Sequence, residues 1–205
     1  MKRWSGACFV AAGLLVLPVV AHPDVFETGF AAASLEPYWT PVHAAGLFVP
    51  VLTILGLGGL AARHGSRLGA VGVLGMVLTV VGLVATTALS AVEAFVFPVL
   101  ARVDPALLEL DGPLLGSQAV RAVGGLALLW FAGLALVGFA AERSGALPRG
   151  AGALLAVSAV GFAAFEGPFV PVLGQLSVVL FAAAYVWVGW ALATDRTGAV
   201  NRPLV

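Results

Sequence analysis

Two glutamates and two histidines lie within or at the ends of long apolar stretches, where ionisable side chains are rare. Glu93 and Glu166 lie inside such stretches, and His22 and His43 lie at their ends. A charged acid at the centre of a bilayer-spanning helix costs at least about 2.5 kcal/mol, so such residues generally mark a site. Two neighbouring carboxylates repel each other and favour sharing one proton. We therefore predict that Glu93 and Glu166 bind an ion or a substrate. No catalytic residue is predicted. Whether the protein is an enzyme stays open, and a non-enzymatic role is favoured.

Both glutamates belong to the same short motif, Glu-x4-Pro-Val-Leu, at residues 93–100 and 166–173. Pro98 and Pro171 are expected to break helices, because proline has no amide to donate to the carbonyl four residues back. A structural role is the alternative for the two acids. Each glutamate, if protonated, would satisfy a carbonyl freed by the proline, that of Ala94 or of Gly167. Binding and structural roles both remain open on the sequence alone.

His22 and His43 are predicted to lie at the same level as the glutamates. Two imidazoles and two carboxylates form a ligand set that suits zinc, manganese or non-haem iron. Two histidines from different helices also suit the axial positions of a haem. No specific ligand spacing, such as paired Glu-x-x-His, supports either cofactor. The nature of any cofactor is therefore unknown. The alternative is a structural role, in which both histidines lie at the membrane interface with their hydrogen bonds satisfied.

The composition assigns the chain to the membrane. Of 205 residues, 61% are hydrophobic and only 10% are charged, whereas a soluble domain carries about 25% charged residues. A formal net charge of zero gives no reason to expect nucleic-acid binding. The single Cys8 excludes an intrachain disulfide and any Cys-x-x-Cys pair. The lipid bilayer is thus the one partner that we predict with a physical reason.

Apolar runs of the length needed to cross a bilayer, about 20 helical residues, occur six times. We predict an all-α polytopic transmembrane bundle forming a single domain over residues 1–205. The third run is too long for one straight crossing and is expected to project outward or bend before Pro98, and prolines interrupt the chain between the last two runs. The predicted spans are approximately 4–21, 44–62, 68–101, 121–141, 151–167 and 173–194.

The repeated motif closes two successive pairs of spans, which predicts an internal repeat of two helices. The units cover about 43–100 and 116–173, and both run inward and then outward. Such a parallel repeat is related by an axis along the membrane normal and would bring the two glutamates together. Small residues share a helical face with each acid, so both acids are expected to face protein. Chance similarity between two proline-terminated apolar helices is the alternative.

Basic residues orient the predicted bundle. With six spans, most Lys and Arg residues, including Arg196 and Arg202, fall on one side, and the opposite loops are acidic. We predict a bacterial-type cytoplasmic membrane location with both termini cytoplasmic, although residues 1–21 also fit a cleaved signal peptide. Tyr38 and Trp39 are expected in the outer aromatic belt. Trp4, Tyr185, Trp187 and Trp190 are expected at the inner boundary.

The favoured function is proton- or cation-linked transport through the glutamate pair. One alternative is an accessory subunit, held by its small-residue faces to a membrane-protein partner or to further copies of itself. The other is a membrane redox protein that binds a metal or haem through the His and Glu cluster.

Overall fold

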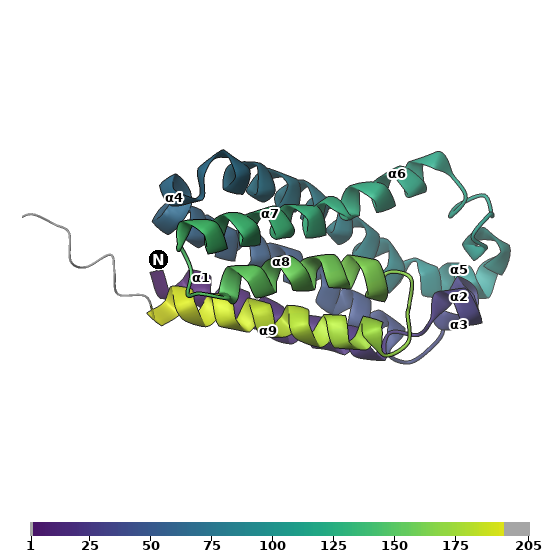
Figure 1. Cartoon of the computed structure of the whole chain (residues 1–205). Helices are drawn as coiled ribbons and strands as arrows, with labels where there is room; N and C mark the ends of the chain where they lie inside the picture. The colour runs from purple at the N-terminus through teal and green to yellow at the C-terminus, as the bar shows by residue number, and fades with distance from the viewer. Residues whose placement is uncertain (1, 195–205) are drawn as a thin grey trace, which may run out of the picture.

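A computed structural model describes residues 2–194 of the chain. The predicted all-α class is confirmed for these residues, which contain helices and no strand. Figure 1 shows the long helices running side by side along one axis of an elongated molecule. The elements are α1 (Lys2–Val16), η1 (Leu17–Ala21), α2 (Val25–Thr28), α3 (Phe30–Ala33), α4 (Trp39–Phe95), α5 (Phe97–Val103), η2 (Pro105–Leu108), α6 (Gln118–Ala127), α7 (Leu129–Ser144), α8 (Ala151–Gly161), η3 (Phe162–Glu166) and α9 (Leu173–Thr194).

Four helical stretches are long and apolar enough to cross a membrane. They are Arg3–Thr28, Trp39–Phe95, Gln118–Ser144 and Leu173–Thr194, whereas Ala151–Glu166 is a shorter apolar helix. Their outward surface is apolar as well, and large side chains such as Trp4, Val157 and Trp190 are more than 65% exposed. An apolar surface of this extent requires lipid rather than water around it. The fold is that of a helical membrane protein.

The 57-residue helix α4 folds back on itself at Gly69. Gly69 has φ 62° and ψ −167°, a backbone conformation that favours glycine because it has no Cβ. The two legs of α4, residues 39–68 and 70–95, run antiparallel, since the Trp39 indole N–H donates to the Glu93 carbonyl at 2.6 Å. The prediction of a loop at 63–67 is wrong, because these residues remain helical up to the turn.

Prolines interrupt the helices where the sequence indicates. The helix breaks at Val96, just before Pro98, and α5 continues from there. Residues 167–172 are non-helical, and Phe169 and Val172 adopt positive φ angles of 54° and 63°. One further break has no counterpart among the predicted ones: Leu128 separates α6 from α7.

Glycines allow the helices to approach one another closely. The second leg of α4 packs against α7, where a Cβ on Gly82 would stand 2.6 Å from the Cα of Trp130. A Cβ on Gly189 in α9 would likewise lie 2.6 Å from the carbonyl oxygen of Gly6 in α1. Packing through small residues is the usual way in which helices associate in lipid. The predicted small-residue face of the third span is therefore a packing face.

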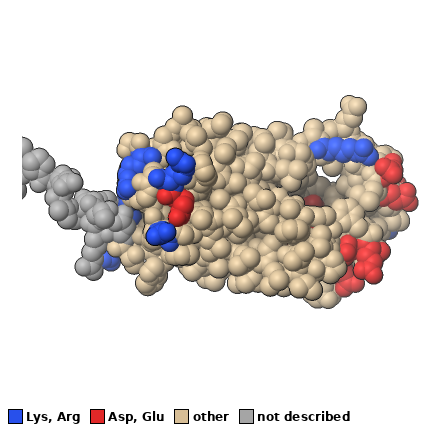
Figure 2. Space-filling view, viewed as in Figure 1, with Lys and Arg blue, Asp and Glu red and all other residues tan. Residues whose placement is uncertain are grey.

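Charged residues gather at the two ends of the molecule. Figure 2 shows most of the visible Lys and Arg near the end that carries the N-terminus, and Asp and Glu mainly at the far end. We call these the basic end and the acidic end. His64 is buried and lines a hollow of about 340 Å³ with Arg67 at the basic end. Arg196 and Arg202 lie outside the described residues.

Candidate functional site

A cavity of about 370 Å³ opens toward the acidic end, and all four predicted site residues line it. Figure 2 shows a hollow at this end of the molecule with an acidic side chain in its depth. The remaining lining is largely aliphatic and aromatic, and none of the described residues that line it is Lys or Arg. The structure thus brings together His22, His43, Glu93 and Glu166, which are far apart in the sequence.

Each of the four residues lies where a helix begins or ends. His22 follows η1 in an extended conformation, and His43 lies in the second turn of α4. Glu93 lies in the last turn of α4, and Glu166 is the last residue of the π-helical turn η3. π-Helical turns occur frequently at functional sites.

Three of these side chains are in direct contact. The Nε2 atoms of His22 and His43 are 3.1 Å apart. His43 Nε2 also lies 3.5 Å from the Oε2 atom of Glu93. The His43 side chain is only 8% exposed, whereas that of Glu93 is 25% exposed. Glu93 therefore has one side against the histidine and the other toward open space.

Backbone carbonyls hold both histidine rings from behind. The Nδ1 atom of His22 lies 2.8 Å from the Pro23 oxygen. The Nδ1 atom of His43 lies 2.8 Å from the Trp39 oxygen. The Trp39 ring, tilted by 35°, has its centroid 4.1 Å from that of His43. Both imidazoles are therefore fixed in orientation, and their Nε2 atoms point at each other.

A second, smaller hollow of about 230 Å³ adjoins the cavity, and we call it the vestibule. His22 and Glu166 line both spaces, whereas Asp24 and Glu27 line the vestibule but not the cavity. Asp24 caps α2 by accepting hydrogen bonds from the amides of Phe26 and Glu27 at 2.9 and 3.1 Å. The approach to His22 is therefore acidic and locally well ordered.

Glu93 is not needed to satisfy the backbone carbonyl that Pro98 leaves free. The Ala94 carbonyl, freed by Pro98, accepts a hydrogen bond from the Thr40 hydroxyl at 3.1 Å. The same helical turn accepts the Trp39 indole N–H at the Glu93 carbonyl. Sequence reasoning missed Thr40 and Trp39, and placing Trp39 in the outer aromatic belt was wrong, because its side chain is fully buried.

Beyond Trp130, which lines the cavity, lies a buried polar group that was also missed. The Tyr185 hydroxyl accepts the Trp130 indole N–H at 3.2 Å. The Thr53 hydroxyl is 3.4 Å from the same oxygen. The sequence places Tyr185 at the inner membrane boundary, but the residue is fully buried. The only available signal was that Thr53 shares a helical face with His43.

The geometry argues against a haem held between the two histidines. A haem held between them would need both Nε2 atoms bonded to its iron, and in this arrangement the two atoms are only 3.1 Å apart. Within residues 2–194, no group of three or more His, Cys, Asp or Glu side chains is arranged to hold a metal ion. The metal-binding role predicted for His22 and His43 therefore gains no support from the described residues.

Fold and site together define a helical membrane protein with an ionisable cavity near one end. Comparison with known proteins adds nothing to this description: no family model, curated protein or solved structure matches the chain.

Proposed function

We propose that the protein carries out proton- or cation-linked transport, with Glu93 and Glu166 binding the ion from the outer side. The observation that supports this most strongly is the cavity, in which two carboxylates face apolar and aromatic walls with no Lys or Arg among the described lining residues. Acids in this setting favour a bound proton or cation, because an isolated carboxylate in an apolar medium is costly. An intramembrane acid facing a cavity is also typical of ion pathways.

In the proposed topology the chain crosses the membrane six times. The crossings are α1 with η1, the two legs of α4, α6 with α7, α8 with η3, and α9. The basic end is cytoplasmic by the positive-inside rule, so the cavity opens outward. The parallel repeat of residues 43–100 and 116–173 belongs to the same proposal. It accounts for two glutamates that end successive outward-running helices and line one cavity.

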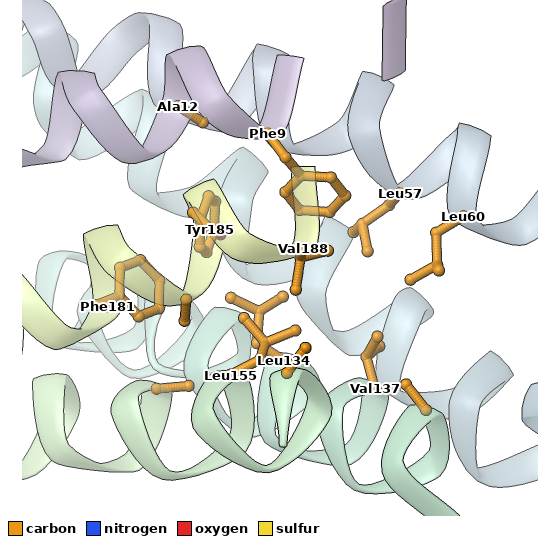
Figure 3. Close-up of a cluster of buried hydrophobic side chains, with 14 of the residues drawn as sticks. Phe9, Ala12, Leu57, Leu60, Leu134, Val137, Leu155, Phe181, Tyr185 and Val188 are labelled. Carbon is orange, nitrogen blue, oxygen red and sulfur yellow. The ribbon is translucent and has the colours of Figure 1, made fainter. Parts of the chain in front are cut away.

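The inner half of the bundle is closed in this arrangement. Figure 3 shows buried side chains from several helices meeting in one apolar cluster, among them Phe9, Leu57, Leu134, Leu155 and Val188. Leu57 and Leu134 lie farther along their helices toward the basic end than the cavity residues do. A transport cycle requires this cluster to part, so the arrangement corresponds to an outward-open state in the proposed cycle.

The test is ion uptake into lipid vesicles that contain the purified protein. Vesicles carry a pH-sensitive dye inside, and a potassium diffusion potential, negative inside, drives proton entry; sodium uptake is followed in parallel. We expect wild-type vesicles to take up one of these ions faster than protein-free vesicles. Glu93→Gln and Glu166→Gln should lower the rate to the protein-free level, because each removes an ionisable oxygen while preserving shape.

Glu109→Gln is the matched control, since Glu109 is exposed in the segment between η2 and α6. It should keep the wild-type rate. Wild-type vesicles that admit neither ion, or Gln variants at the two sites that transport like wild type, would contradict the proposed role of the glutamates.

A further inference from the structure

The two histidines of the cavity present an unusual hydrogen-bonding problem. A backbone carbonyl only accepts hydrogen bonds, so the Nδ1 atom of His22, 2.8 Å from the Pro23 oxygen, must carry a hydrogen. The same holds for the Nδ1 atom of His43, 2.8 Å from the Trp39 oxygen. A neutral imidazole has one protonated nitrogen and one acceptor nitrogen. If both rings were neutral, both Nε2 atoms would therefore be bare acceptors.

Two bare acceptors do not approach to hydrogen-bonding distance without something between them. Their lone pairs would face each other across the observed 3.1 Å between the Nε2 atoms. This distance is within the normal range for a nitrogen-donated hydrogen bond. One Nε2 must then carry an additional hydrogen and donate it to the other. In this arrangement the pair would hold three ring protons and one positive charge.

We propose that His22 and His43 form a proton-binding site, in which one proton is held in common between their two Nε2 atoms. This inference deepens the proposed function, because it names the proton as the transported or coupling ion. The role of the site in transport rests on that proposed function. The inference adds the histidine pair to the site formed by the glutamates, with Glu93 as the counter-ion 3.5 Å from His43 Nε2.

Acidic groups around this pair are able to balance a positive charge on it. The charged or titratable groups that face it are Glu93 from α4, Glu166 from η3, and Asp24 and Glu27 from the vestibule. All four are acids, and neither space has Lys or Arg among its described lining residues. Aromatic faces add to this, because the His43 ring lies 4.1 Å from the Trp39 ring and the His22 ring lies 5.1 Å from that of Phe169, between centroids. Such distances allow cation–π attraction.

The placement of the two rings gives the proton a direction. His22 lines both the vestibule and the cavity, whereas the side chain of His43 is nearly closed off. A proton arriving from the acidic end first forms the Nε2–H bond of His22. Transfer breaks that bond and forms the Nε2–H bond of His43, next to the Glu93 carboxylate. No other atom changes its bonding partner, so the step requires no further reactant.

A metal ion is the competing occupant for two converging Nε2 atoms, since a zinc-like ion also prefers histidines whose Nδ1 atoms donate to carbonyls. The proton is favoured because residues 2–194 contain no group of three His, Cys, Asp or Glu ligands arranged for a metal. A proton needs only the two nitrogens that are present.

The test is nitrogen NMR of histidine-labelled protein in lipid bilayers at neutral pH, after treatment with a chelator. The chain has three histidines, and His64 lies at the basic end as an internal reference. We expect three of the four ring nitrogens of His22 and His43 to carry hydrogen. We also expect a nitrogen–nitrogen coupling across the Nε2···Nε2 hydrogen bond. His22→Asn should abolish the coupling, and His64→Asn should leave it unchanged.

Unprotonated Nε2 atoms on both rings would overturn the inference. So would a stoichiometric metal that survives the chelator and is bound by both Nε2 atoms. The outcome is independent of the vesicle assay. A shared proton without ion uptake would refute transport while leaving the site intact, and ion uptake with two bare Nε2 atoms would refute the site while leaving transport intact.

Discussion

Replacing Gly82 by alanine tests whether the helices approach as closely as described. Gly82 lies in the second leg of α4 against the first residues of α7. A Cβ at this position would stand 2.6 Å from the Trp130 Cα and 2.8 Å from the Leu129 carbonyl carbon, and would overlap the Trp130 amide nitrogen. These are backbone atoms, so no side-chain rotation relieves the overlap. The two helices must separate instead.

The magnitude can be worked out from the distances. An ordinary Cβ contact begins at 3.4 Å, so the helices must part by at least about 0.8 Å to clear the Trp130 Cα alone. A gap of about 0.5–1 Å already loses a quarter to a half of each dispersion contact. Overpacking of this kind typically costs about 1–3 kcal/mol, and a backbone clash belongs in the upper part of that range. Alanine's better helix propensity returns about 1 kcal/mol. We expect Gly82→Ala to lower the free energy of unfolding by about 1–2 kcal/mol.

Gly58→Ala is the matched control, because Gly58 lies in the other leg of α4 and a Cβ there meets nothing within 4 Å. Reversible unfolding in mixed micelles, followed by far-UV circular dichroism, should show Gly58→Ala to be unchanged or stabilised by up to about 1 kcal/mol. Gly82→Ala should also alter the fluorescence of Trp130, whose helix is displaced. Equal stability of the two variants would refute the close α4–α7 packing.

Three further changes test individual hydrogen bonds. Thr40→Val removes the donor to the Ala94 carbonyl and should lower the free energy of unfolding by about 1–3 kcal/mol, since the carbonyl is left unsatisfied. Tyr185→Phe deprives the Trp130 indole of its acceptor, which should cost about 1–3 kcal/mol and shift the tryptophan emission. Glu142→Ala removes the carboxylate that accepts the amide of Gly150, just before α8, and the amide of Ala153 in its first turn; this should cost about 1–2 kcal/mol. Each is measured by the same unfolding assay.

Each of these variants has a control in the chain. Thr87→Val removes a hydroxyl that bonds only within its own helix turn. Tyr38→Phe and Glu109→Ala alter side chains that are exposed. Changes of this kind usually stay within about 0.5 kcal/mol. A control as costly as its partner would show that the named hydrogen bond carries no particular stability.

The fold class and the approximate helix positions were predictable because a bilayer imposes its thickness on the apolar runs. The breaks near Pro98 and Pro171 were predictable as well, since a missing amide acts locally. The predicted spans place a reversal of the chain between residues 62 and 68, but its position at Gly69 was not predictable, because the sequence contains 26 glycines and no local pattern shows which one takes a positive φ. The helical continuation through residues 63–67 was missed because Arg and His are common in loops but also tolerate helix.

That the four residues of the candidate site lie together was predictable from the sequence, but their geometry was not. A repeated motif identified Glu93 and Glu166. The position of His22 and His43 at the ends of apolar runs identified the two histidines. The contact between the two imidazoles depends on how η1 packs beside the start of α4, which is a tertiary relation. The burial of Trp39 and Tyr185 was missed for a related reason: the sequence shows which segments are apolar, but the face that a ring presents to its neighbours depends on packing.

The short helix at α8 has a consequence for the bilayer itself. The 11 residues of α8 and the 5 of η3 rise about 24 Å at roughly 1.5 Å each, less than the hydrocarbon thickness of about 30 Å. Lipid beside a helix that falls short adapts by thinning. In the proposed topology, where α8 and η3 form one crossing, the headgroup region is therefore expected to dip toward Glu166 at the end of this helix. A dimple in the outer leaflet would bring water and lipid phosphates close to the vestibule, so that proton access would vary with the acyl-chain length of the surrounding lipid.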